Sequence, residues 1–141
     1  MRVLIFSLIL TFFFTSYAQN SYMPKTLDMK ERAVIVDRWL QDRMATVLPD
    51  LMKRTGIDMW LIIAREYNED PILRTMLPST WQSARRTTIL VIYDPGDQKP
   101  LETMAMARYA VGDLFRKVWD KETQPDQWKA LAALIKEKDP K

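Results

Sequence analysis

A hydrophobic segment that runs directly into a dense cluster of charges constrains this chain more than any other feature. Ile57–Ala64 is apolar almost throughout, and the polar segment Arg65–Asp70 follows it without a break. Near-continuous apolar character is typical of a strand buried on both faces, so we expect Ile57–Ala64 to lie at the centre of an α/β sheet. Such folds bind ligands where strands end. The polar segment is therefore the first place to search for a site.

A long helix is predicted before this strand. Asp28 followed by Glu31 fits a capping box at its start, and apolar residues spaced by three and four continue the pattern to Met52. Gly56 suits a left-handed helix end. Pro49 lacks a backbone donor and crowds the preceding turn, so we expect a kink or a restart there.

Shorter elements are predicted after the polar segment. Asp70 and Pro71 favour the start of a short helix that ends at Leu77, and Ser79 favours a second capped turn. The β-branched segment Arg86–Asp94 predicts the second strand.

The remainder of the chain predicts a hairpin and a final helix. Asp94–Asp97 has the Pro-Gly centre of a type II turn, which leads into a third strand over Leu101–Tyr109, antiparallel to the second. We expect helical structure over Leu114–Trp119. The last helix begins near Pro125 and Asp126 and ends in lysines, which suit a helix C-terminus.

The first eighteen residues have the pattern of a cleaved secretory signal. Arg2 is followed by the twelve-residue, mostly apolar run Val3–Phe14, and Ser16-Tyr17-Ala18 places small residues at the cleavage positions. A membrane anchor is the alternative, but a spanning helix needs about 20 apolar residues. We therefore predict an exported protein, periplasmic or secreted, with no membrane attachment after cleavage.

The predicted organisation is a signal over residues 1–18, a leader over 19–27, one domain over 28–138 and the start of a linker over 139–141. Without the signal the chain has twenty basic and eighteen acidic residues, a net charge of +2. This charge is too small to predict nucleic-acid binding. The sequence contains no His and no Cys, which excludes imidazole or thiolate catalysis and metal binding by these side chains.

Charged residues gather in and after the polar segment. Glu66, Glu69 and Asp70 form either a metal or acid/base site, or a loop whose acids cap the next helix; the sequence lacks a calcium-loop pattern and favours the loop. The arginines nearby either pair with these acids or hold a carboxylate ligand. They are Arg65, Arg74, Arg85 and Arg86.

Two apolar patterns indicate ordinary core packing. Met104 and Met106 alternate along the third predicted strand and share one face. Trp128 belongs to the apolar stripe of the last helix. Tyr67 fits either a ring that faces a ligand or a half-buried position in the loop, and the pattern favours the half-buried position. All five tryptophans follow the signal, so they are available to the core.

Three segments resemble the N-terminal domain of the pita-bread metallopeptidases, the group of creatinase, prolidase and aminopeptidase P. They are RWLQDRMATVLPDLMKRTGIDMWLIIAREYNEDP (Arg38–Pro71), LPSTWQSARRTTILVIYD (Leu77–Asp94) and MARYAVGDLF (Met106–Phe115). The helix followed by GIDMWLI resembles the opening of the whole group. REYNEDP and the TWQSARRTTILVIYDPGD run resemble an exported bacterial branch of Xaa-Pro aminopeptidase-like proteins.

The resemblance implies a mixed β-sheet flanked by helices, similar to the ribonuclease-H-like class. It also implies that catalysis takes place in a separate C-terminal pita-bread domain, where two divalent metal ions are held by Asp, His and Glu ligands. None of those ligands can be placed on this sequence, so no catalytic or metal-binding residue is assigned. The expected partners are that domain, a second copy in a homodimer, and proline-containing peptides.

In this family the N-terminal domain shapes the entrance to the active site, often across a dimer interface. By that analogy, Arg65, Glu66 and Tyr67 are the candidates for facing the substrate cleft or a partner. Two other functions stay open. One is a free-standing exported binding module without peptidase activity, and the other is an enzyme that uses Glu66, Glu69 or Asp70 alone.

Overall fold

The computed structural model describes residues 26–96 and 99–141. Contacts divide the chain into two units, Met1–Arg32 and Ala33–Lys141. The described part of the first unit contains the predicted capping box: the Glu31 amide donates to Asp28 Oδ1 at 2.7 Å, and the Asp28 amide donates to Glu31 Oε2 at 3.3 Å. The predicted signal lies outside the described residues.

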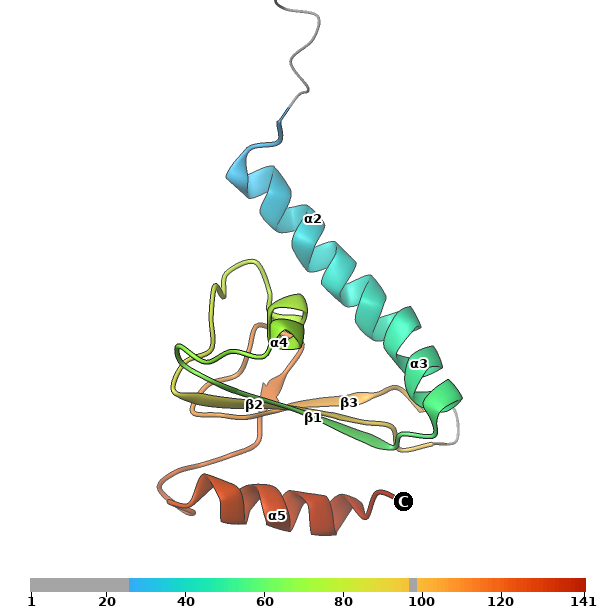
Figure 1. The fold of residues 1–141 in the computed structure, drawn as a ribbon, viewed down its shortest axis with the longest axis vertical. Helices are drawn as coiled ribbons and strands as arrows, with labels where there is room; N and C mark the ends of the chain where they lie inside the picture. Colours follow the sequence, from blue (N-terminus) through green and yellow to red (C-terminus); the bar gives the residue numbers. More distant parts are fainter. Residues whose placement is uncertain (1–25, 97–98) are drawn as a thin grey trace, which may run out of the picture. The chain divides into compact units, whose positions relative to one another are not determined.

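The second unit is built on a four-stranded mixed sheet, which confirms the α/β class (Figure 1). Its order is β1 (Met59–Arg65), β2 (Thr87–Tyr93), β3 (Glu102–Met106) and β4 (Arg116–Lys117). β1 and β3 both run antiparallel to β2, while β4 runs parallel to β3.

The expectation that the first strand lies at the centre of the sheet is wrong. β1 is an edge strand, and β2 is the strand whose five inner residues are all buried. Ile63 of β1 is 45% exposed. An apolar edge strand and an apolar central strand have the same sequence pattern, because helices cover both faces of this sheet. Only the pairing order separates them.

One long helical segment precedes β1. It consists of α2 (Met29–Asp42), the π-helical turn η1 (Arg43–Val47) and α3 (Leu48–Thr55). Pro49 lies in the first turn of α3, and the irregularity expected there occurs just before it, where the Leu48 amide donates to the Arg43 carbonyl. A π-turn relieves the clash between proline and the preceding turn without ending the helix. Gly56 then ends α3 in the left-handed conformation, as predicted.

Within the second unit, the part of this segment from Leu40 onward and the short helix α4 (Pro71–Met76) pack on one face of the sheet (Figure 1). The helical residues buried there recur every four positions: Leu40, Met44, Leu48 and Met52. They pack with residues of the strands, chiefly Ile62, Leu90 and Ile92. Trp39 and Val47 also fit the three-and-four spacing of apolar residues in this segment, but both are mostly exposed.

Helix α5 (Gln127–Lys138) covers the opposite face (Figure 1). It begins where predicted, and Asp126 caps it by accepting from the amides of Trp128 and Lys129. Leu131 packs on Met104 and Met106, which are buried as predicted. Trp128 is 55% exposed, so its assignment to the core is wrong. Helical spacing defines an apolar stripe, but within it only Leu131 is buried against the sheet.

Two further predictions are wrong. One concerns the segment between β3 and α5, and the other concerns Ser79, which precedes β2. The residues expected to be helical, Leu114–Trp119, contain β4 instead, because Arg116 and Lys117 pair with Met104 and Ala105 of β3. Ser79 caps no helical turn. Its amide and hydroxyl donate to the carboxylate of Asp37, at 2.7 and 2.8 Å.

The loop between β2 and β3 begins as predicted. Gly96 has a φ of 71°, and its amide donates to Asp94 Oδ1 at 2.9 Å.

Among the described residues, no helix is both long and apolar enough to cross a membrane.

Candidate functional site

The candidate residues Arg65, Glu66 and Tyr67 lie where β1 leaves the sheet. Arg65 and Asn68 exchange two backbone hydrogen bonds, of 3.2 and 2.9 Å, so the chain reverses in a tight turn with Glu66 and Tyr67 at its tip. The Glu66 amide also donates to the carbonyl of Arg86 at 2.7 Å. This turn is therefore anchored to the sheet at its base, while its tip projects beyond it.

Tyr67 is the most exposed part of this turn. Its side chain is 97% exposed and its φ is 66°, in the left-handed region that non-glycine residues rarely adopt. The expectation of a half-buried ring in the loop is therefore wrong. A large aromatic ring in this position gains nothing from intramolecular packing, which makes it available to a ligand or partner.

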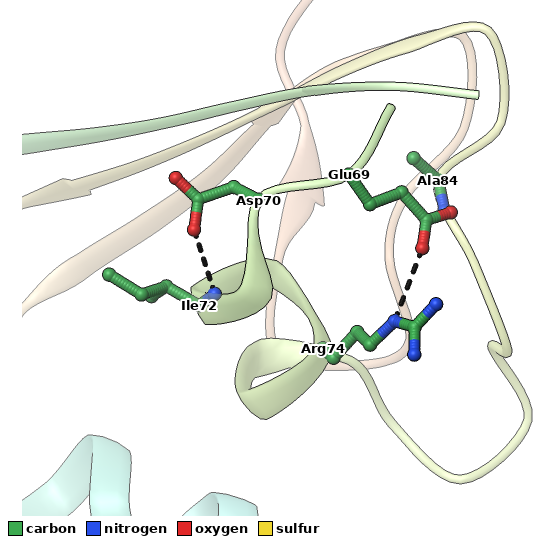
Figure 2. A network of polar contacts seen from close by, with 5 residues as sticks. All are labelled: Glu69, Asp70, Ile72, Arg74 and Ala84. Carbon is green, nitrogen blue, oxygen red and sulfur yellow. Dashed lines mark hydrogen bonds and ion pairs between the residues drawn. The ribbon is translucent and has the colours of Figure 1, made fainter. Parts of the chain in front are cut away.

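The acidic residues that follow are used to hold the loop and α4 together (Figure 2). Asp70 Oδ1 accepts from the Ile72 amide at 2.8 Å, which confirms its predicted role as the helix cap. Glu69, only 10% exposed at its side chain, accepts from the Ala84 amide at 2.8 Å and from Arg74 Nε at 3.3 Å. These two carboxylates stabilise the local fold.

The guanidinium groups of two of the four arginines have partners within the described residues. Arg74 pairs with Glu69, and the Arg85 guanidinium lies 4.8 Å from the centre of the Trp81 ring, in cation–π range. No described residue pairs with the guanidinium groups of Arg65 or Arg86. Internal pairing therefore explains only half of this cluster.

Two shallow depressions flank the turn. One, of about 510 Å³, is lined by Glu66, Tyr67, Glu69, Pro71, Arg74 and Ser83. The other, of about 280 Å³, is lined by Arg65, Glu66, Tyr67, Arg86 and Thr87. Glu66 and Tyr67 line both, so they form the ridge that separates them. The two depressions have a carboxylate and an aromatic ring in common, and each has at least one guanidinium group.

The structure thus brings the three candidates together with Arg86, which the sequence had placed in the same region. Ser83 and Thr87 were not predicted as part of the site. Ser83 lies in the connection between α4 and β2. The sequence of this loop has no periodic pattern from which its position beside the turn could have been predicted. Thr87 is opposite Arg65 in the pairing of β1 and β2.

The chemistry available at this surface is recognition by charge, hydrogen bonds and an aromatic ring. No described residue donates to the side chain of Glu66. Within residues 26–96 and 99–141, no group of three or more acidic residues is arranged to hold a metal ion. Glu66, Glu69 and Asp70 are neighbours in sequence, but the last two point toward backbone amides (Figure 2).

Comparison with protein-family models, with curated proteins and with solved structures found no match to this chain. The resemblance to the pita-bread metallopeptidases therefore rests on the sequence alone.

Proposed function

We propose that this chain is the non-catalytic N-terminal domain of an exported Xaa-Pro aminopeptidase-like metallopeptidase, with the ribonuclease-H-like fold of that domain. In this proposal the catalytic site, with its two divalent metal ions, lies in a pita-bread domain that follows Lys141. The Glu66–Tyr67 ridge borders the entrance to that site or contacts the second copy of a homodimer. Proline-containing peptides are the substrates.

One observation carries the proposal more than any other. Of the clustered carboxylates, Glu69 and Asp70 accept backbone hydrogen bonds that build α4 and its loop, whereas Glu66 and Tyr67 project from the surface. A division of this kind suits a domain that contacts a substrate or partner and leaves the chemistry to another domain. The complete lack of His and Cys in the sequence supports the same conclusion.

The first test is the gene sequence beyond Lys141. The proposal requires that the next few hundred residues contain the two Asp, one His and two Glu ligands of a dimetal centre. A reading frame without these ligands would refute it.

The second test is made in the full-length enzyme. We expect Tyr67→Ala to weaken binding of proline-containing peptides, or dimerisation, by about tenfold, the effect of truncating an aromatic interface anchor. Tyr67→Phe retains the ring and should preserve most of the binding. The control is Lys53→Ala, an exposed position on α3 at the other end of β1. If Tyr67→Ala and Arg65→Ala changed neither the peptide affinity nor the oligomeric state, the proposed role of the ridge in substrate access or dimerisation would be wrong.

A further inference from the structure

Two arginines border the smaller of the depressions beside the turn. This depression has a volume of about 280 Å³, and its lining consists of Arg65, Glu66, Tyr67, Arg86 and Thr87. Within the described residues, neither guanidinium group has an acidic or an aromatic partner. A guanidinium group without a partner in the protein can hold an anionic ligand through two parallel hydrogen bonds.

The backbone holds the two arginines at the same place. Arg65 is opposite Thr87 at the end of the pairing of β1 with β2. One position further, the Glu66 amide donates to the Arg86 carbonyl at 2.7 Å. Arg86 has a φ of 58°, and Tyr67 on the rim of the same depression is also in the left-handed region. Strained backbone of this kind persists where the surrounding structure fixes it, and it is common at ligand sites.

The two depressions beside the turn differ in charge. The smaller one is lined by two guanidinium groups and the Glu66 carboxylate, a net charge of +1. The larger one is lined by Glu66, Glu69 and Arg74, a net charge of −1, and its one guanidinium group already pairs with Glu69. An anionic group is therefore attracted to the smaller depression and repelled by the larger one.

The charge of the smaller depression also indicates the kind of anion. A phosphate group carries a charge of about −1.5 to −2 at pH 7, and the Glu66 carboxylate beside the arginines would repel it more strongly than a singly charged group. A carboxylate has one charge, and its two oxygens match the fork of a guanidinium group. The Tyr67 ring, which is 97% exposed, adds an aromatic surface for an apolar part of the same ligand. The C-terminal end of a peptide combines these features.

We propose that this depression is a subsite for the C-terminal carboxylate of a short peptide. Arg65 and Arg86 hold the carboxylate, and the residue before it packs on the Tyr67 ring. The identity of the ligand as a peptide rests on the proposed function. The subsite gives the enzyme a preference for peptides that end near this surface, because an amidated end or an internal peptide unit has no negative charge for the arginines to bind.

Equilibrium binding to the whole gene product, measured by titration calorimetry, tests this subsite. The probes are two N-acetylated tripeptides with a central proline, which differ only in having a free acid or an amide at the C-terminus. Acetylation removes the free N-terminus that an aminopeptidase requires, so binding is measured without cleavage. The free acid should bind at least about tenfold more tightly, the effect of a hydrogen bond to a charged group. The difference should decrease in high salt.

Variants of the arginines locate the effect. Arg65→Gln and Arg86→Gln should each bring the affinity of the free acid close to that of the amide. Arg86→Lys retains the charge without the fork, so its affinity should be intermediate. The matched control is Arg85→Gln, which should preserve the full preference, because the Arg85 guanidinium lies 4.8 Å from the centre of the Trp81 ring and Arg85 does not line the depression.

Three results would overturn the subsite. The first is equal binding of the two peptides to the wild type, or binding of neither. The second is full preference for the free acid in both Arg65→Gln and Arg86→Gln. The third is inorganic phosphate that binds at the arginines as tightly as the free acid, which would contradict the assignment to a carboxylate.

The outcomes separate the subsite from the proposed function. Metal ligands beyond Lys141 together with equal binding of the two peptides overturn the subsite alone. A preference for the free acid that requires both arginines, in a gene product that lacks those metal ligands, supports the subsite and overturns the peptidase assignment.

Discussion

The two halves of the polar segment after β1 have opposite roles. In Arg65–Tyr67, two backbone hydrogen bonds fix the turn and the side chains are free to meet another molecule. In Glu69–Asp70, the side chains themselves accept backbone hydrogen bonds and hold α4 and its loop in place. Adjacent residues with similar charge can therefore belong to a contact surface or to the scaffold. Burial and partners decide which.

Glu69→Ala should have the largest effect on the stability of the domain. The Ala84 amide is buried and would lose its acceptor, and leaving a buried donor unsatisfied costs about 2 kcal/mol. Urea denaturation measures the change in the free energy of unfolding. Glu69→Gln keeps an acceptor oxygen and should lose less. If Glu69→Ala and Glu66→Ala were equally stable, the division between the two halves would be wrong.

Asp70→Ala should have an intermediate effect. It removes the cap of α4, and loss of an N-cap side chain typically costs about 1 kcal/mol. Asp70→Asn retains a capping oxygen and serves as the matched control in the same denaturation experiment. An Asp70→Ala protein as stable as the wild type would show that packing alone holds α4.

Arg74→Ala should have a smaller effect. The guanidinium group pairs with Glu69 but is 72% exposed, and exposed ion pairs contribute at most about 1 kcal/mol. The loss should also shrink in high salt, which screens the pair. A loss as large as that of Glu69→Ala would mean that the ion pair, and not the Ala84 hydrogen bond, orients the Glu69 carboxylate.

Tyr67→Ala should have the smallest effect on stability, within about 0.5 kcal/mol of the wild type, because the ring is almost fully exposed. Its effect on peptide affinity or dimerisation in the full-length enzyme should exceed that of Glu69→Gln. A large loss of stability in Tyr67→Ala would show that the ridge belongs to the scaffold.

The parts of the fold that could be predicted from sequence depend on residues close together in the chain. The predicted caps at Asp28 and Asp70 each bond to amides within three positions. The left-handed end at Gly56 and the antiparallel pairing of β2 with β3 are likewise local. A side chain and a backbone group that are close together in the chain can meet in only a few conformations. The local sequence pattern is therefore sufficient to predict these caps and turns.

The predictions that failed required contacts between distant parts of the chain. β1 is apolar like a central strand but lies at the edge, and β4 forms only because it can pair with β3. The exposure of Tyr67 and Trp128 depends on how far the sheet and helices extend. None of these outcomes is encoded in a local pattern.

The sequence by itself determined the α/β class, most helix and strand positions, and the polar segment at the end of β1 as the place to search for a site. Only the tertiary structure decided that Glu69 bonds to Ala84, fifteen residues away, while Glu66 stays on the surface. The physical reason is that a carboxylate accepts a hydrogen bond from a buried donor only if the fold brings that donor near it. Tertiary packing decides which donor this is, and a local sequence pattern does not specify that packing.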